Sequence, residues 1–94
     1  MVELVTLQGT VEDRPILTIE NGRDVLRFEV RDAATGAVDL VELAGEGASN
    51  AALVLRPGHP IVAVVVPSRE PNGAARAVAF GLDLMQVPVR VLEQ

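Results

Sequence analysis

The sequence predicts one mostly-β domain with a single short helix, and three features predict it. Several segments alternate aliphatic and polar residues with the period of two that half-buried strands show. An Asn-Gly pair at residues 21–22 favours the type I′ turn of a β-hairpin. Only one segment has a helix-forming composition followed by a helix stop, and it ends at the Arg-Pro-Gly of residues 56–58.

The first strand is predicted over residues 2–11. Every second residue from Val5 to Val11 is aliphatic or glycine, so these residues share the inner face. Gly9 inside the strand indicates a bulge or a sharp bend. Charged residues and a proline then break the pattern at 12–15, and residues 16–20 resume it as a short extension.

The second and third strands follow the Asn-Gly turn. The second is predicted over residues 24–31, with Val25 and the charged residues facing outward, and the third over 38–44. A short loop at 32–36 joins them. The residues expected to point into the core are Leu26, Phe28, Val30, Val41 and Leu43.

A helix comes next, capped by Ser49 or Asn50 and extending to about Leu55, with Leu53 on its apolar side. Arg56 suits its C-terminus, where a cation interacts favourably with the helix dipole. Residues 61–66 form a β-branched run, which predicts a well-buried strand.

The last elements are a polar loop at 67–73, a long strand at 75–85 and a short extended tail at 88–92. One helix between the third and fourth of five strands is the layout of the OB-fold, a five-stranded Greek-key barrel. We therefore expect residues 1–94 to form a single OB-fold domain.

Composition excludes several functions. The chain has no cysteine, which excludes a disulfide, a thiolate metal site and a cysteine nucleophile. His59 is the only histidine, and no nucleophile, base and orienting partner come together, so we expect neither an enzyme nor a cofactor. No apolar run approaches the length of a membrane span and no signal sequence is recognisable, so we expect a cytoplasmic protein.

Four stretches carry a family resemblance. Residues 5–11 read V-x-L-x-G-x-V and are followed by Asp-Arg-Pro, and residues 25–30 alternate around Phe28. Residues 45–58 have the form G-x-x-A-x-x-x-A-x-x-L-x-x-G, and a strand of the form G-x-x-I-x-A-V begins at Gly58. This order resembles the bacterial single-stranded-DNA-binding protein (SSB) family, which includes the SSB-like primosomal replication protein. The match covers about residues 2–85.

The resemblance implies an OB-fold that binds single-stranded DNA in replication, recombination or repair. It also implies a homo-oligomer, dimer or tetramer, that associates through first-strand edges, where Leu4, Thr6 and Gln8 face outward. The family stacks bases on aromatic residues, but this chain has no Trp or Tyr. Phe28 and Phe80 are its only aromatic residues, and both are expected in the core.

Arginines are therefore the candidate DNA ligands, since all eight cations of this chain are arginines and its net charge is −5. Arg27 and Arg31 share the outer face of one strand, where they contact phosphates or pair with Glu29 or Glu42. The other candidates lie beside loops and turns, where they bind DNA or keep the surface soluble: Arg14, Arg23, Arg69 and Arg76.

Two functions follow from these observations. The first is a weak single-stranded-DNA-binding protein with a possible replication or repair partner. The second is an SSB paralogue that has lost DNA binding and acts as a module for protein–protein interaction and oligomerisation. The acidic charge and the missing aromatic residues favour the second.

Overall fold

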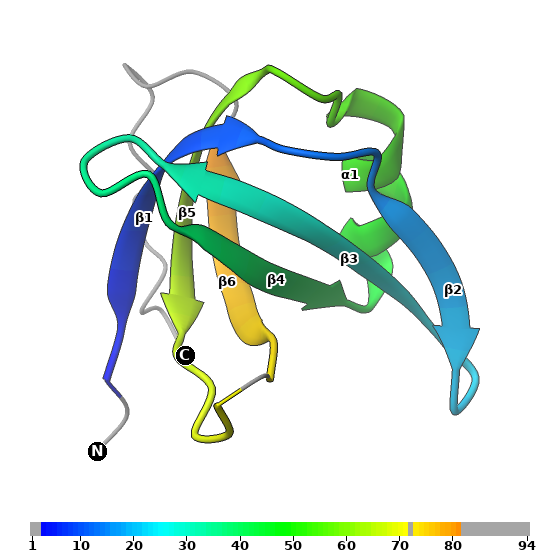
Figure 1. Cartoon of the computed structure of the whole chain (residues 1–94). Coiled ribbons are helices and arrows are strands. Elements are labelled where there is room, and N and C mark those ends of the chain that lie inside the picture. Colours follow the sequence, from blue (N-terminus) through cyan, green and yellow to red (C-terminus); the bar gives the residue numbers. More distant parts are fainter. Residues whose placement is uncertain (1–2, 72, 82–94) are drawn as a thin grey trace.

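A computed structural model describes residues 3–71 and 73–81 of the chain. Within these residues the chain forms six strands and one helix (Figure 1). In chain order they are β1 (Val5–Val11), β2 (Ile16–Glu20), β3 (Arg23–Asp32), β4 (Val38–Ala44), α1 (Glu46–Val54), β5 (Pro60–Val66) and β6 (Ala75–Gly81). No helix in the described part of the chain is long and apolar enough to cross a membrane.

Five of the strands close into a barrel. The sheet runs in the order β1-β5-β6-β4-β3-β2, and a further pairing between β1 and β3 closes the barrel. The pairing of β4 with β6 is parallel, and the other pairings are antiparallel. The helix lies between the third and fourth barrel strands, β4 and β5. The predicted OB-fold is therefore confirmed, with β2 as a sixth strand that extends the sheet beyond the barrel.

Closure of the barrel depends on a bend in β1 at Gly9. This residue pairs with Ile61 of β5 and also with Asp32 of β3. A Cβ atom at this position would lie 2.8 Å from the carbonyl carbon of Arg31 and overlap its oxygen. Only glycine lets the two strands approach this closely, so a close backbone contact is the reason for a glycine inside this strand.

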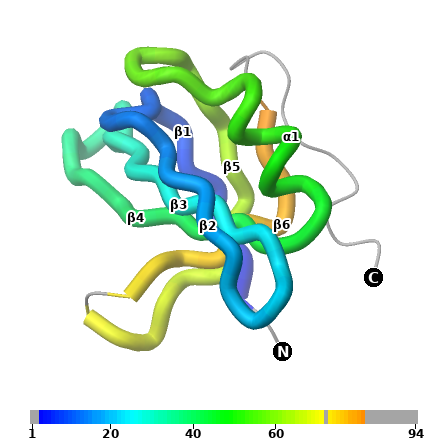
Figure 2. The backbone as a smooth tube through the Cα atoms, turned by 90° about the vertical axis from the view of Figure 1, so that its right-hand side faces the viewer, coloured from blue at the N-terminus to red at the C-terminus, as the bar shows by residue number. Residues whose placement is uncertain are grey.

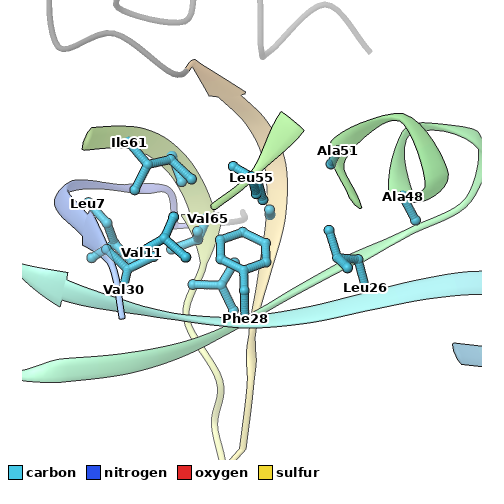
Figure 3. Close-up of a cluster of buried hydrophobic side chains, with 13 residues drawn as sticks. Leu7, Val11, Leu26, Phe28, Val30, Ala48, Ala51, Leu55, Ile61 and Val65 are labelled. Carbon is cyan, nitrogen blue, oxygen red and sulfur yellow. The ribbon is translucent and has the colours of Figure 1, made fainter. Parts of the chain in front are cut away.

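The barrel interior is filled by aliphatic side chains around Phe28 (Figure 3). Phe28 is only 2% exposed, and the half-buried Phe80 packs against the same cluster, as expected for both. The helix covers one end of the core with Ala48 and Ala51, which lie over Leu26. Because alternate residues of β3 fill this core, the residues between them point outward.

The turns explain how the strands are joined. Asn21 and Gly22 have φ angles of 53° and 76°, which confirms the predicted type I′ turn between β2 and β3. In the β3–β4 loop the Asp32 carboxylate accepts hydrogen bonds from the amides of Ala34 (2.7 Å) and Thr35 (3.0 Å). Both turns are therefore fixed by local chemistry.

The helix differs from its prediction. It begins at Glu46 after Gly45, and no side chain caps it, so the prediction of Ser49 or Asn50 as the cap was wrong. The Gly45 amide instead donates to the Asp24 carbonyl, and a φ of 96° turns the chain directly from β4 into α1. Leu53 was wrongly expected to pack inward, since it is 72% exposed.

Two further expectations need correction or lie outside the structure. Val25 points away from the barrel interior, but it is buried beside Thr18 and Ala44, its partners on β2 and β4. The last strand is described to Gly81. The predicted continuation to residue 85 and the tail at 88–92 lie outside the described residues.

Candidate nucleic-acid interface

The outward side chains of β3 and β4 form one continuous surface, which we call the outer face. The register of the two strands places Arg27 opposite Glu42, Glu29 opposite Leu40 and Arg31 opposite Val38. Paired residues in adjacent strands project to the same side of a sheet. The outer face therefore mixes two arginines, two carboxylates and two partly exposed aliphatic side chains.

A groove of about 750 Å³ lies on this face. Arg14, in the connection between β1 and β2, and Ile16, at the start of β2, line one side of the groove. The outer face supplies Arg27, Glu29 and Leu40. The groove combines two arginines and aliphatic surface with the carboxylates of Asp13 and Glu29. A single strand of nucleic acid presents the matching chemistry, with phosphates on one side and bases on the other.

Arg27 is held by two carboxylates. Its Nη2 atom lies 2.9 Å from an oxygen of Glu20 and 2.9 Å from one of Glu42, and its Nε donates to Glu42 at 3.1 Å. Its Nη1 donates to the second oxygen of Glu20. These hydrogen bonds raise the pKa of Arg27 and lower the pKa of Glu20. The predicted alternative, pairing with Glu42, is confirmed.

Arg31 forms a bidentate pair with a different carboxylate. Its Nε and Nη2 atoms donate to the two oxygens of Glu12 at 2.9 and 2.6 Å. Its Nη1 donates to the Gly36 carbonyl at 2.8 Å. The hydrogen bonds from Arg31 lower the pKa of Glu12 below its ordinary value. The expected partners, Glu29 or Glu42, were wrong because Glu12 reaches Arg31 from the loop that follows β1.

Both arginines nevertheless keep a surface that a ligand can reach. The side chain of Arg31 is 48% exposed and that of Arg27 is 36% exposed. A guanidinium carries five N–H groups, and Arg31 uses three of them. A phosphate can therefore contact the free N–H groups or displace a carboxylate.

The remaining candidate arginines are distributed unevenly. Arg76 of β6 pairs with Glu42 in the parallel register, so Arg27, Glu42 and Arg76 form a row across three strands. Arg14 lines the groove, and Arg69 is exposed in the loop between β5 and β6. Within residues 3–71 and 73–81, the candidate arginines that form no ion pair and no side-chain hydrogen bond are Arg14, Arg23, Arg69 and Arg76.

Two arginines do not belong to this surface. Arg23 lies at the far end of β3, beside Gly45 at the start of α1. Arg56 donates to the Leu55 carbonyl at 3.2 Å, next to the C-terminus of α1 as predicted. The structure therefore brings Arg14, Arg27, Arg31 and Arg76 to one side of the barrel and leaves Arg23 apart.

The apolar part of the outer face is aliphatic. Val38 and Leu40 of β4 are among the exposed large hydrophobic residues, and Ile16 extends this surface onto β2. Phe28 lines the groove floor but is almost completely buried. Sequence analysis did not identify Ile16 or Leu40 as site residues. Their position on β2 and β4, the two strands that pair with the arginine-bearing β3, was the signal available.

A metal site is not formed by the described part of the chain. No group of three or more histidine, aspartate and glutamate side chains in residues 3–71 and 73–81 could hold a metal ion. The chemistry of this surface is therefore that of its arginines, carboxylates and aliphatic side chains.

This chain is similar to known proteins in structure. No protein-family model and no curated protein matches the sequence. The second single-stranded DNA-binding protein of Mycobacterium smegmatis is similar in structure, with a TM-score of 0.79 and 19% identity over 96% of this chain and 97% of that protein.

Two further solved structures have a similar fold. The small single-stranded DNA-binding protein of Streptomyces coelicolor aligns with a TM-score of 0.67 and 22% identity, over 90% of this chain and 97% of that one. The mitochondrial single-stranded DNA-binding protein of S. cerevisiae aligns with a TM-score of 0.76 and 9% identity, over 87% and 94%. The chain therefore has the OB-fold found in bacterial and mitochondrial single-stranded DNA-binding proteins.

Proposed function

We propose that this protein binds single-stranded DNA weakly, along the groove on the outer face. The observation that carries the proposal is the groove itself, where Arg14 and Arg27 lie beside Ile16 and Leu40. The shared fold supports this assignment, because the three similar structures are those of single-stranded DNA-binding proteins.

The proposed mode of binding combines phosphate contacts with apolar contacts to bases. Arg14, Arg27, Arg31 and Arg76 contact successive phosphates, while bases lie against Val38 and Leu40. Aliphatic side chains replace aromatic stacking, which is worth about 1–3 kcal/mol per base. Phosphates also compete with the carboxylates that hold two of the arginines. Binding is therefore weak, independent of base sequence and sensitive to salt.

The biological setting forms part of the same proposal. We infer a cytoplasmic homo-oligomer, dimer or tetramer, that acts without catalysis in replication, recombination or repair, with a replication or repair protein as a further partner. The primosome is one such setting. The resemblance of the sequence to the SSB family supports these assignments.

Fluorescence anisotropy with labelled oligo-dT tests the function. The unmodified protein binds at 50 mM salt with a micromolar dissociation constant, and Arg14→Gln and Arg76→Gln each weaken binding. Arg56→Gln is the matched control, because it removes the same charge at the end of α1, outside the outer face. If no binding occurs at high micromolar protein, DNA binding is refuted and the protein-interaction function takes its place.

A further inference from the structure

Glu29 is a carboxylate that lies in the groove without a cation of its own. Its side chain lines the groove and is half-buried. Among the described residues it forms no ion pair and no side-chain hydrogen bond, whereas Glu12, Glu20 and Glu42 each hold an arginine. The pairing of the arginines therefore does not explain why a carboxylate faces the groove at this position.

The backbone holds Glu29 in a fixed position between two arginines. Its carbonyl accepts a hydrogen bond from the Glu12 amide at 2.8 Å, and the residue pairs with Leu40 of β4. Arg27 and Arg31 precede and follow it by two residues, so each lies about 6.7 Å away along the same face of the strand. The three side chains therefore alternate in charge along the outer face.

A bound single strand brings its sugars to this carboxylate. Phosphates that contact both Arg27 and Arg31 span the four residues between them, which is about 13 Å of strand. In every nucleic acid a sugar separates one phosphate from the next. At least one sugar of a strand bound in this way therefore lies between the two arginines, beside Glu29.

Deoxyribose and ribose differ in what they offer to a carboxylate. An ionised carboxylate only accepts hydrogen bonds. The sugars and phosphates within a DNA strand carry no O–H or N–H donor, so DNA removes water from Glu29 and returns no hydrogen bond, which costs free energy. The 2′-hydroxyl of ribose is a donor, and its hydrogen bond to a carboxylate is charge-assisted. Glu29 therefore favours ribose over deoxyribose.

We propose that the groove also binds single-stranded RNA, and that Glu29 accepts a hydrogen bond from a ribose 2′-hydroxyl there. This inference rests on the proposed function, since it uses the same groove and the same arginines. Arg27 and Arg31 bind the phosphates of either nucleic acid, and Glu29 selects the sugar. RNA binds more tightly than DNA of the same base sequence by about three- to tenfold, the factor that one net hydrogen bond supplies.

Fluorescence anisotropy with three labelled oligonucleotides of one length tests the preference for ribose. Oligo-rU, oligo-dU and 2′-fluoro-oligo-U share their base and their phosphates, and the 2′-fluoro sugar keeps an RNA-like shape without a donor. Oligo-rU should bind about three- to tenfold more tightly than either of the others. Because all three present the same number of phosphates, this ratio should stay constant as salt rises, although each affinity falls.

Glu29→Gln tests the residue, because it removes the charged acceptor and keeps the shape of the side chain. Oligo-rU should bind this variant more weakly and oligo-dU more tightly, so that the preference for ribose is lost. Glu46→Gln is the matched control, since it makes the same change in charge at the start of α1, beside Arg23 and outside the groove. Figure 2 shows β4 on one side of the molecule and α1 on the other. Far-UV circular dichroism verifies that both variants fold.

The outcomes separate this inference from the proposed function. Equal affinity of the unmodified protein for oligo-rU and oligo-dU overturns the inference and leaves DNA binding intact. A preference that persists in Glu29→Gln, or 2′-fluoro-oligo-U that binds as tightly as oligo-rU, also overturns it. If oligo-rU alone binds, DNA binding fails and the inference stands. If none of the oligonucleotides binds, both fail.

Discussion

Neutralising Glu12 should strengthen DNA binding, although Glu12 itself contacts no DNA in our account. Its carboxylate occupies two donors of Arg31, at 2.9 and 2.6 Å. Glu12→Gln removes the negative charge that holds the guanidinium and leaves a side chain of similar shape. Because exposed ion pairs contribute little to stability, we expect the variant to remain folded.

The magnitude follows from the number of phosphates that Arg31 can then neutralise. In the unmodified protein the Glu12 carboxylate offsets the charge that Arg31 brings to its phosphate, and in Glu12→Gln this phosphate is neutralised in full. One more neutralised phosphate steepens the dependence of log K on log salt by about 0.7 for single-stranded DNA. This corresponds to an increase in affinity of about 8-fold at 50 mM salt and about 3-fold at 200 mM salt. The change therefore grows as salt falls, which distinguishes a new phosphate contact from altered folding.

Glu29→Gln supplies the control. Glu29 lies on the same face of β3 and forms no ion pair among the described residues, so its neutralisation changes the net charge equally but releases no arginine. Oligo-dT anisotropy at four salt concentrations measures both slopes. If Glu12→Gln and Glu29→Gln have the same slope, the competition between Glu12 and phosphate is refuted.

Three further predictions concern stability, measured by urea or thermal unfolding. Gly9→Ala should lower the free energy of unfolding by about 3 kcal/mol or more, because the new Cβ overlaps the Arg31 backbone. Gly47→Ala is the control, because its Cβ meets only Leu43 at 4.0 Å, and it should raise the free energy of unfolding by about 0.5–1 kcal/mol. Phe28→Ala should cost about 3–5 kcal/mol, as truncation of a buried aromatic side chain does; a loss below about 1 kcal/mol would contradict the assigned core. Pairing with Arg31 lowers the pKa of Glu12 from 4.5, so the stability that this ion pair contributes is present above pH 4.5 and is lost as the pH falls below that value. The melting temperature of Glu12→Gln should therefore fall less on acidification than that of the unmodified protein.

The parts of the fold that sequence predicted are those fixed by local chemistry. The Asn21–Gly22 turn needs two positive φ angles, which these residues adopt readily, and the alternation in β3 separates Phe28 from Arg27. The helix start was missed because it is set by a hydrogen bond from Gly45 to Asp24, a residue on a different strand. A capping rule that considers neighbouring residues only cannot include this bond.

The sequence predicted which arginines lie on the outer face better than it predicted which carboxylates they pair with. Arg27 and Arg31 were placed on the correct face, and the pairing of Arg27 with Glu42 follows from a simple cross-strand register. The partnership of Arg31 with Glu12 depends on β1 bending across β3, which no local pattern specifies. Closure of the barrel, rather than sequence spacing, decides which charges meet.

The most direct test of the account is an NMR titration of isotope-labelled protein with oligo-dT at low salt. Binding along the groove predicts concentration-dependent shifts of backbone amides in β3, β4 and the start of β6, including Arg27, Leu40 and Arg76. Amides near Arg23 and Arg56 should remain unchanged. Absence of shifts at millimolar oligonucleotide, or shifts confined to residues outside the outer face, would contradict the proposed interface.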